Sequence, residues 1–522
     1  MNEAVDADGS DGHLAEQLYA IDQAPPQVRW LEAAEWLLLV AALFGLALLL
    51  PRASLTPGGS HFLIAVGVIG LWRYALRAVH LCRALWFLHV RYPRLRERAE
   101  RAGKLAAPSH VYFLATSFRI DPLTTAQVYR AIFAEAAHCG YPATVVASIV
   151  EYGDEMLIKA LWQRAGLPQR IALRIVRIPG TGKRDGLASG FRAISRDAPD
   201  DRALVAVVDG DSVLLPGVIR KCAQMFHVLP KVGALTTNEF CSVHGGRLVG
   251  EWHRMRFAER HLNMCSMALT HRVLTLTGRM SLFRAGIATS PEFIADVEHD
   301  SALHWRLGRV KFLTGDDKSS WFSVIRQGWD TFYLPDAAIH TIEHPPDPSF
   351  FKTSRTLMFR WYGNSLRQNG RARKLGPRRL GWFTWYVLQD QRVQMWAGLL
   401  GLAAAVLASV RYSYYYLLGY LIWVGATRCL MCLVLKLGGH PISPLYPALM
   451  YYNQIVGSMT KVFVLFFPDR QSWTRQNTRL ASELDGFHRR FNDWSSRILL
   501  FTALSLFTAV VTTIVLMKPR YG

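Results

Sequence analysis

Residues 205–211 have the sequence VAVVDGD, an apolar run that ends in two aspartates around one glycine. This run predicts a buried β-strand with its two carboxylates at the carboxyl end, where the sheets of α/β domains bind ligands. Two carboxylates together with phosphate oxygens suit a hard cation such as Mg²⁺ or Mn²⁺. The glycine would let the backbone approach a ligand. Such a triplet also occurs in ordinary solvent-exposed turns, so the surrounding sequence has to decide.

Short β-rich runs alternate with helical stretches around this strand. The expected strands are residues 110–116, 143–150, 171–178 and 203–209, and the expected helices between them include residues 124–139 and 186–194. This alternation predicts a parallel sheet with helices on its faces. We assign the α/β domain to residues 104–350.

Apolar runs flank this domain on both sides, and a bilayer crossing needs about 17–25 such residues. They are residues 33–50, 393–410, 414–435 and 498–517, and a fifth run begins at His61. Before the α/β domain we expect an acidic segment at 1–30 and two transmembrane helices with a basic flank at 31–103. After it we expect basic interfacial helices at 351–390 and two transmembrane helices at 391–437. An interfacial or re-entrant helix and loop at 438–496 and a last transmembrane helix at 497–522 would follow. Residues 1–30 are acidic and polar, so we expect no cleavable signal peptide.

Charge placement indicates which side of the membrane the domain faces. The chain of 522 residues is 51% hydrophobic and carries a net charge of +21, which excludes a disordered protein. Six bases lie in residues 91–104 and nine in residues 351–390, next to the apolar runs. The positive-inside rule then predicts a multi-pass membrane protein with a cytoplasmic domain, and membrane flanks explain the charge better than nucleic-acid binding. Five and six crossings both stay open.

The fifth apolar run continues into a basic helical face made of Arg73, Arg77, His80 and Arg83. Charges within a membrane usually face a bundle interior or a wet path, so this face could line the route of a polyanionic chain. Alternatively, the membrane helix ends near Trp72 and the arginines lie among lipid headgroups.

Three further motifs carry candidate chemistry. In the acidic pair Asp316 and Asp317, mutual repulsion would raise one pKa and so produce a base near neutral pH, although a helix-capping turn would look the same. The glycine-rich stretch around Lys183 follows a strand and suits phosphate, or is an ordinary turn. Arg-Trp at residues 360–361 and Trp-Thr-Arg at 473–475 suit ligand contacts, or interfacial tryptophans with snorkelling arginines.

In this order the motifs, from about residue 110 to 475, resemble the processive membrane glycosyltransferases of family 2, which include cellulose, chitin and hyaluronan synthases. The resemblance implies a GT-A-type cytoplasmic glycosyltransferase domain inserted between transmembrane helices. It also implies roles for individual residues. Asp317 would be the catalytic base with Asp316 beside it, and Asp209 and Asp211 would hold the metal. The nucleotide sugar would be bound by Thr116, Glu151, Lys183, Asp209 and Arg475. The acceptor would be bound by Arg360, Trp361 and the segment 277–284.

Two departures from that family point to a different sugar. The glutamine of its Gln-x-x-Arg-Trp motif is replaced by Leu357, and Lys318 follows the acidic pair where hyaluronan-type enzymes tend to carry arginine. Longer stretches, such as HVYFLATSFRID at 110–121 and FLTGDDKSSWFS at 312–323, resemble the catalytic subunits of mannuronan synthases, the alginate polymerases. This resemblance implies GDP-mannuronate as donor, β-1,4-linked polymannuronate as the growing product, a PilZ-domain membrane subunit that binds cyclic di-GMP, and periplasmic alginate-export proteins.

Three other functions stay open at this point. Another processive family 2 synthase could use a UDP-sugar, and a non-processive lipid-linked sugar transferase would share the sheet and the Asp-x-Asp motif. A catalytically inactive transporter or scaffold would share the membrane segments alone. Donor identity distinguishes the first alternative from a mannuronan synthase, and product length distinguishes the second. Metal-dependent nucleotide release distinguishes an enzyme from the third alternative.

Overall fold

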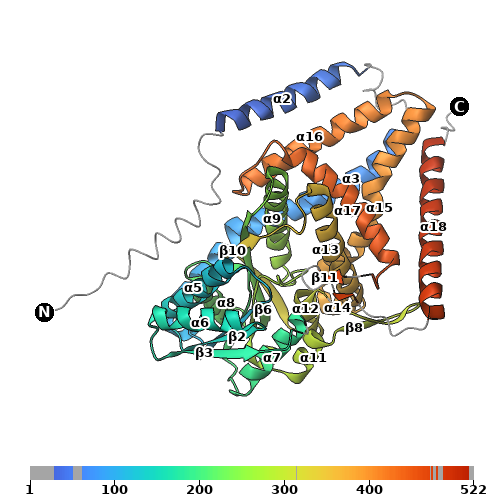
Figure 1. Cartoon of the computed structure of the whole chain (residues 1–522). Coiled ribbons are helices and arrows are strands. Elements are labelled where there is room, and N and C mark those ends of the chain that lie inside the picture. Colours follow the sequence, from blue (N-terminus) through green and yellow to red (C-terminus); the bar gives the residue numbers. More distant parts are fainter. Residues whose placement is uncertain are drawn as a thin grey trace.

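The fold is known from a computed structural model, which describes residues 29–50, 61–180, 182–312, 314–470, 472–473, 478–479 and 486–516. An α/β domain built on an eight-stranded sheet lies at one end of the molecule, and long apolar helices extend from it toward the other end (Figure 1). The order of strands across the sheet is β3-β2-β1-β4-β7-β6-β10-β5.

The first half of the sheet is parallel, as predicted. Its strands are β1 (Val111–Thr116), β2 (Ala143–Ile149), β3 (Ile171–Arg177) and β4 (Leu204–Asp209), and the helices between them are α5 (Pro122–His138), α6 (Tyr152–Ala165) and α7 (Lys183–Ser195). Every residue of β1 and β2 is buried because helices cover both faces of the sheet. The register pairs Thr116 with Ser148 on one side and with Asp209 on the other, so these three residues end at the same edge.

The second half is mixed, whereas the strand–helix alternation predicted a wholly parallel sheet. It contains β5 (Ser212–Leu214), β6 (Val232–Val243), β7 (Met280–Arg284) and β10 (Asp330–Glu343), with α8 (Val218–Val228) before β6. β7 runs antiparallel to both β4 and β6, and β5 runs antiparallel to β10. For β7, the connection explains the direction: α9 (Arg247–Ala268) follows β6 but packs mainly on the apolar helices, so it makes no standard crossover to a parallel strand.

Short elements complete the domain and its basic flanks. They are a π turn (Phe87–Arg91), α4 (Tyr92–Arg101), a 3₁₀ turn (Gly103–Ala106), α10 (Ala285–Ala288), α11 (Pro291–Glu298), a hairpin of β8 (Ser301–His304) and β9 (Gly308–Lys311), α12 (Asp316–Arg326), α13 (Phe350–Arg373), α14 (Gly376–Leu380), and a hairpin of β11 (Ser472–Trp473) and β12 (Thr478–Arg479). Of these, α12 begins at the acidic pair and α13 carries the Arg-Trp motif.

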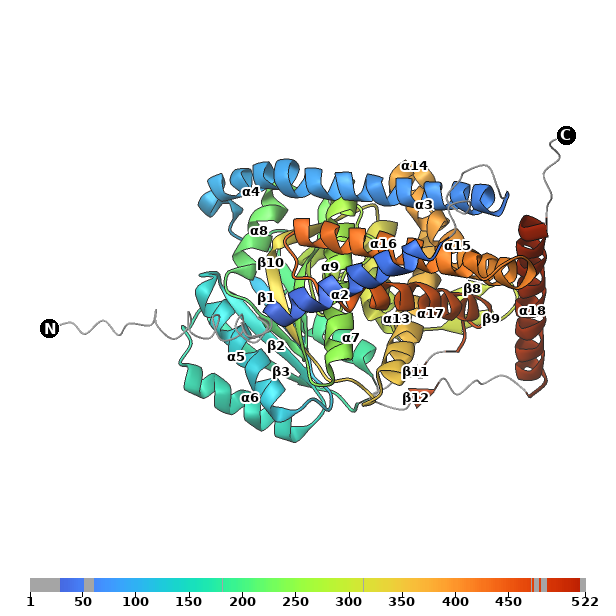
Figure 2. The same ribbon diagram turned by 90° about the horizontal axis from the view of Figure 1, so that it is seen from above.

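In the part of the chain that the structure describes, six long helices form the apolar part: α2 (Arg29–Leu48), α3 (His61–Trp86), α15 (Trp382–Arg411), α16 (Tyr415–Leu437), α17 (Tyr446–Phe466) and α18 (Gly486–Leu516). Among the described residues, Trp382–Arg411, Tyr415–Leu437 and Arg490–Leu516 are long and apolar enough to cross a membrane, and Ala33–Leu48 is a shorter apolar helix. α18 stands at the end away from the sheet in both views (Figures 1 and 2). Its large exposed side chains, such as Phe501 at 73%, suit contact with lipid.

The basic face of α3 is turned toward protein. The helix continues beyond Trp72 to Trp86, as the basic helical face predicted, and the point where it leaves the membrane stays a prediction. Arg73 forms an ion pair with Asp390 of α15, and Arg83 donates to the backbone oxygen of Ser266 on α9 at 3.0 Å. These contacts help to fix α3 against α9 and α15, and α9 in turn packs on β6, β10 and α13.

Close packing of α7 on β1 depends on a glycine. A Cβ at Gly190 would overlap the buried side chain of Leu114, whereas a Cβ at Gly153 on the exposed side of α6 would meet no atom within 4 Å. We therefore expect Gly190→Ala to destabilise the domain by about 1–3 kcal/mol, the usual cost of overpacking. The matched control Gly153→Ala should be neutral or slightly stabilising. Melting temperatures of the purified proteins measure the effect, and equal values for the two variants would contradict this packing.

Candidate active site

The site is built on the edge where β1, β2 and β4 end. A pocket at this edge is lined by Thr116, Ser117, Phe118, Gly182, Lys183 and Asp209, together with residues of β2 and the loop after β3. It brings together three of the five residues predicted to bind a nucleotide sugar. Ser117 and Phe118 were not predicted, and their only sequence signal is that they follow the first strand directly.

Gly210, between the two aspartates, allows β4 to turn against β1. A Cβ at this position would lie 2.7 Å from the backbone oxygen of Thr116 and 3.2 Å from the Cα of Ser117. The glycine therefore makes room for the backbone of the chain itself, whereas the sequence suggested that it makes room for a ligand. The glycine thus lets the end of β4 lie close to β1, where Asp209 lines the pocket.

Lys183 joins two carboxylates from distant parts of the sequence. It is the first residue of α7, and its Nζ lies 3.2 Å from Oδ2 of Asp209 and 3.0 Å from Oδ2 of Asp316. Burial would lower the pKa of this lysine, but Asp209 and Asp316 outweigh burial and hold the pKa well above its ordinary value. Lys183 is therefore a fixed positive charge between the end of β4 and the start of α12.

The acidic pair forms the first turn of α12. The helix follows Gly315, whose φ of +86° favours glycine, and a Cβ there would press against Asn364 of α13. Burial raises the pKa of Asp317, and the negative charge of Asp316 raises it further. Burial acts in the same direction on Asp316, but Lys183 and Arg184 outweigh it and lower that pKa. The pair thus contains one carboxylate held ionised and one made more basic.

Gly278 lies against these charged groups. A Cβ at this position would be 3.6 Å from Nζ of Lys183, 3.7 Å from Cβ of Asp317 and 4.0 Å from Oδ2 of Asp209. The predicted acceptor segment 277–284 therefore contacts the acidic pair and the Asp-x-Asp strand at the same point. Its backbone also accepts a hydrogen bond, from the amide of Asp209 to the oxygen of Arg279 at 2.9 Å.

A buried polar network, which the sequence did not reveal, fixes α12 in place. Arg184 donates to the backbone oxygen of Thr314 at 3.1 Å and to Oγ of Ser319 at 3.0 Å. Ser319 and Gln368 of α13 both donate to Asp300, which also pairs with Arg371. Only the adjacent Lys-Arg pair in the glycine-rich stretch hinted at a second functional cation.

The Arg-Trp motif of α13 faces α9. Trp361 stacks on Trp252 with ring centroids 5.7 Å apart, and the guanidinium of Arg256 lies 4.0 Å from the centre of the Trp361 ring. Glu343 lies nearby. Burial would raise its pKa, but Arg279 and, more weakly, Arg360 lower it to about 2. The motif thus belongs to a cluster of aromatic and charged groups between the sheet and the apolar helices.

Three predicted residues lie differently from this constellation. Glu151 lies outside the pocket lining, with its side chain 55% exposed and 3.9 Å from Arg119. Asp211 accepts a hydrogen bond from the amide of Ile342 through its backbone oxygen. Arg475 lies outside the described residues, so its predicted contact with the nucleotide sugar stays a prediction.

Asp209 and Asp211 fit a divalent cation only in part. The described residues contain no group of three or more His, Cys, Asp or Glu side chains that could hold an ion. Two carboxylates are nevertheless suitable oxygen ligands for Mg²⁺ or Mn²⁺, which commonly take their other ligands from substrate phosphates and water. A bound diphosphate would therefore have to complete the site.

Comparison with known proteins supplies a family. Residues 108–364 match the model described as "Glycosyltransferase like family 2". The chain is 57% identical to "Glycosyltransferase alg8" of Pseudomonas syringae pv. tomato over 93% of this chain and 98% of the relative. It is 56% identical to "Glycosyltransferase alg8" of Azotobacter vinelandii over 92% and 97%.

Among solved structures, the mannosyltransferase PcManGT from Pyrobaculum calidifontis in complex with GDP-Man and Mn²⁺ is similar to this chain at 12% identity. The match covers 86% of this chain and 96% of that one with a TM-score of 0.36. A likeness this low supports no argument about this site.

The double ion pair of Lys183 predicts a pH-dependent loss of stability on substitution. Its charge keeps Asp316 ionised, so the lowered pKa of Asp316 contributes stability that is present above the unfolded pKa of about 3.9 and is lost as pH falls through the folded pKa. Lys183→Met should cost about 3–5 kcal/mol at pH 7, the usual penalty for breaking a buried pair.

Melting temperatures between pH 2 and pH 7 test this expectation. The difference between wild type and Lys183→Met should be largest near pH 7 and should shrink as pH falls below about 3.9, where the contribution of Asp316 is lost. Lys159→Met is the control, because Lys159 makes only an exposed pair with Glu155 on α6. A Lys183→Met difference that does not depend on pH would contradict the assigned role of Asp316.

Proposed function

This chain belongs to the Alg8 glycosyltransferases of family 2, and we propose that it polymerises mannuronate from GDP-mannuronate into β-1,4-linked polymannuronate. It is a membrane glycosyltransferase of alginate (mannuronan) synthesis that uses a nucleotide sugar. The observation that carries the proposed reaction is Lys183, whose ammonium joins the Asp-x-Asp carboxylate Asp209 to the acidic pair through Asp316.

The donor would bind in the pocket at the ends of β1 and β4. Lys183 begins a helix at the pocket wall, and the positive end of a helix together with an ammonium suits a diphosphate. Asp209 and Asp211 would hold Mg²⁺ or Mn²⁺, and this ion, when bound, would neutralise charge on the leaving diphosphate. Thr116, also in the pocket lining, would contact the nucleotide.

Asp317 would act as the base of an inverting transfer. The acceptor hydroxyl oxygen forms a bond to the anomeric carbon, the bond to the GDP oxygen breaks, and the hydroxyl proton passes to Asp317. The raised pKa of Asp317 supports this role because a more basic carboxylate takes the proton more readily. The ionised Asp316, held by Lys183, would stay fixed beside it.

The acceptor chain would lie along α13 and pass toward the apolar helices. Trp361 offers an aromatic face of the kind on which sugars stack, and Arg360 precedes it on the same helix. Product transfer through the membrane would follow the path between the sheet and helices α13, α15 and α17, which pack on one another.

The cellular setting is part of the proposal. The domain division given by the sequence would place a cytoplasmic catalytic domain between the helices of a multi-pass inner-membrane protein. A PilZ-domain subunit that binds cyclic di-GMP would regulate synthesis, and periplasmic alginate-export proteins would receive the polymer. Glu151 and Arg475 would contact the nucleotide sugar.

Donor screening with the full-length protein in lipid nanodiscs, together with its regulatory subunit, tests the proposed function. We expect polymer from GDP-mannuronate in the presence of Mg²⁺ or Mn²⁺, and none from UDP-glucuronate or UDP-glucose. Long products on a gel indicate processive synthesis, whereas single additions to a lipid would indicate a non-processive transferase. Polymer formed from a UDP-sugar alone would contradict the donor assignment.

Asp317→Asn isolates the proposed base, because the amide keeps the shape of the side chain but cannot accept the proton. We expect polymer synthesis to fall by about 10²–10⁴-fold, the usual contribution of a general base. Binding of GDP-mannuronate, measured by calorimetry, should persist. Synthesis at the wild-type rate would remove Asp317 from the mechanism.

Lys318→Gln should change the pH dependence of synthesis. The base works in its ionised form, so synthesis rises with pH through the pKa of Asp317. The positive charge of Lys318 lowers the pKa of Asp317. Burial lowers the pKa of Lys318 itself to about 8; Asp317 opposes this shift and Arg260 adds to it more weakly. Lys318 is therefore charged below about pH 8. Its removal should therefore move the acid limb of the pH–rate profile to higher pH. Lys159→Gln should leave that limb in place, and an unmoved or lowered limb in Lys318→Gln would contradict the assignment.

A further inference from the structure

Helix α9 presents two guanidinium groups toward the site that no step of the proposed transfer uses. Arg256 and Arg260 are four residues apart, so they lie on one helix face, and Trp252 continues that face one turn earlier. The helix contacts β6 and β10 on one side and α3, α13, α16 and α17 on the other. These arginines therefore lie between the sheet and the apolar helices.

Arg256 lies among aromatic side chains. Its guanidinium lies 4.0 Å from the ring centre of Trp361 and 4.8 Å from that of Trp252. Within the described part of the chain it forms no ion pair, and its buried Nη1 has no hydrogen-bond partner. Glu259 and Glu343 act on it only at a distance, and burial lowers its pKa. Such a charge is costly to keep unless a ligand supplies the missing anion.

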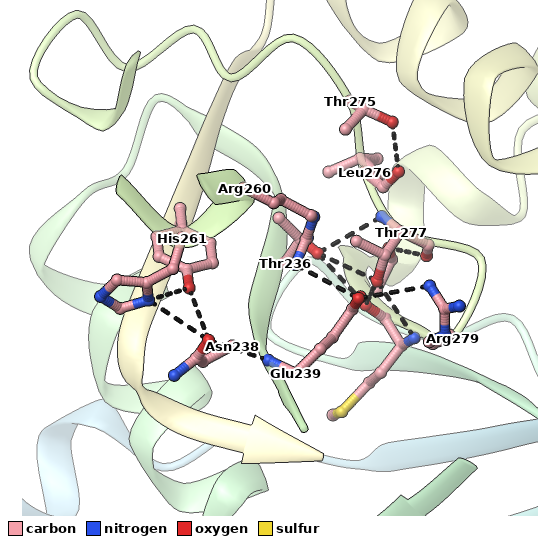
Figure 3. A network of polar contacts seen from close by, with 12 residues as sticks. Thr236, Asn238, Glu239, Arg260, His261, Thr275, Leu276, Thr277 and Arg279 are labelled. Carbon is pink, nitrogen blue, oxygen red and sulfur yellow. Dashed lines mark hydrogen bonds and ion pairs between the residues drawn. The ribbon is translucent and has the colours of Figure 1, made fainter. Parts of the chain in front are cut away.

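Arg260 is paired on one side only. Figure 3 shows Glu239 between Arg260 and Arg279, each 3.3 Å from the same carboxylate oxygen. Arg279 also pairs with Glu343, while the buried Nη2 of Arg260 lacks a partner among the described residues. Arg260 and Arg279 thus balance Glu239 and Glu343, and Arg256, which pairs with neither carboxylate, leaves the three guanidiniums with a net positive charge.

This charge lies next to the proposed reacting groups. Arg260 shares Glu239 with Arg279, and the residue before Arg279 is Gly278, which lies against Asp317. Arg256 covers Trp361, the proposed acceptor platform. In a β-1,4-linked mannuronate chain the attacking hydroxyl is on C4 and the carboxylate is attached to the neighbouring C5. A site for that carboxylate must therefore lie on the side of the acceptor near the base, and Arg260 is connected to that side through Glu239 and Arg279.

We propose that Arg256 and Arg260 bind the carboxylate of the acceptor sugar whose hydroxyl is glycosylated. The inference rests on the proposed function, because it needs a uronate acceptor. Arg256 would donate through Nη1 and Arg260 through Nη2, and two charged donors on one carboxylate favour an acidic sugar over a neutral one. A site built to bind a charged group discriminates strongly against an analogue that lacks it, because its donors are then left unpaired.

Two acceptors of equal length test the subsite: an oligomannuronate, and the β-1,4-mannooligosaccharide obtained by reducing its carboxylates. With GDP-mannuronate saturating, the readout is the ratio of kcat/KM for the two acceptors, which does not depend on the fraction of folded enzyme. Wild type should prefer the acidic acceptor by about 10–100-fold, the value of a hydrogen bond to a charged group. Arg256→Gln should reduce this preference to a few-fold, mainly through KM.

Two further variants make the result decisive. Arg254→Gln on the same helix should keep the wild-type preference, because Arg254 is paired with Glu251 at 2.8 Å. Arg256→Lys, which keeps the charge, should retain part of the preference and supplies the ratio if Arg256→Gln is inactive. If the wild type is active and Arg256→Gln keeps its preference for the acidic acceptor, the proposed carboxylate subsite is wrong but the proposed function stands. The same holds if Arg256→Lys keeps the full wild-type preference. A wild type that transfers nothing from GDP-mannuronate would overturn the proposed function as well.

Discussion

One ammonium group, Nζ of Lys183, holds together the two acidic motifs on which the site depends. Asp209 ends a central strand and Asp316 begins α12, and without a cation between them these half-buried carboxylates would repel each other. The next residue, Arg184, donates to the loop that carries the acidic pair. Two adjacent bases at the start of α7 thus set the distance between the donor pocket and the proposed base.

Hydrogen bonds connect the same region to the apolar helices through α13. Asp300 accepts hydrogen bonds from Ser319 of α12 and Gln368 of α13, and Thr314 donates to Asn364 of α13 at 2.7 Å. Since α13 packs closely on α17, the base, the Arg-Trp motif and the apolar bundle form one connected unit. A polymerase needs such a connection, because the chain must be extended at one end and moved along its path after each addition.

Local sequence patterns were enough to predict the first half of the fold. The four parallel strands have continuous apolar runs and the helices between them have clear periodicity, so their order and direction follow from rules that act over short distances. The antiparallel β7 was missed because its direction depends on where α9 packs. The helical face of bases beyond Trp72 was visible in the sequence, but its contacts were not, because Arg73 and Arg83 contact α15 and α9, far along the chain.

The candidate site was predictable to the same extent. Motif spacing identified Lys183, Asp209 and the acidic pair, and the structure places these together. It could not reveal that one lysine contacts both motifs, or that Arg256 and Arg260 of α9 lie near Trp361 and Lys318, since no short-range pattern relates these positions. Glu151, by contrast, follows a strand as expected but lies outside the pocket lining, with its side chain exposed beside Arg119.

The most direct test is a structure of the full-length protein with GDP and Mn²⁺ at a resolution that shows side chains. The account predicts the ion between the carboxylates of Asp209 and Asp211, with the diphosphate within hydrogen-bond distance of Nζ of Lys183. A diphosphate bound away from Lys183 and both aspartates would contradict it.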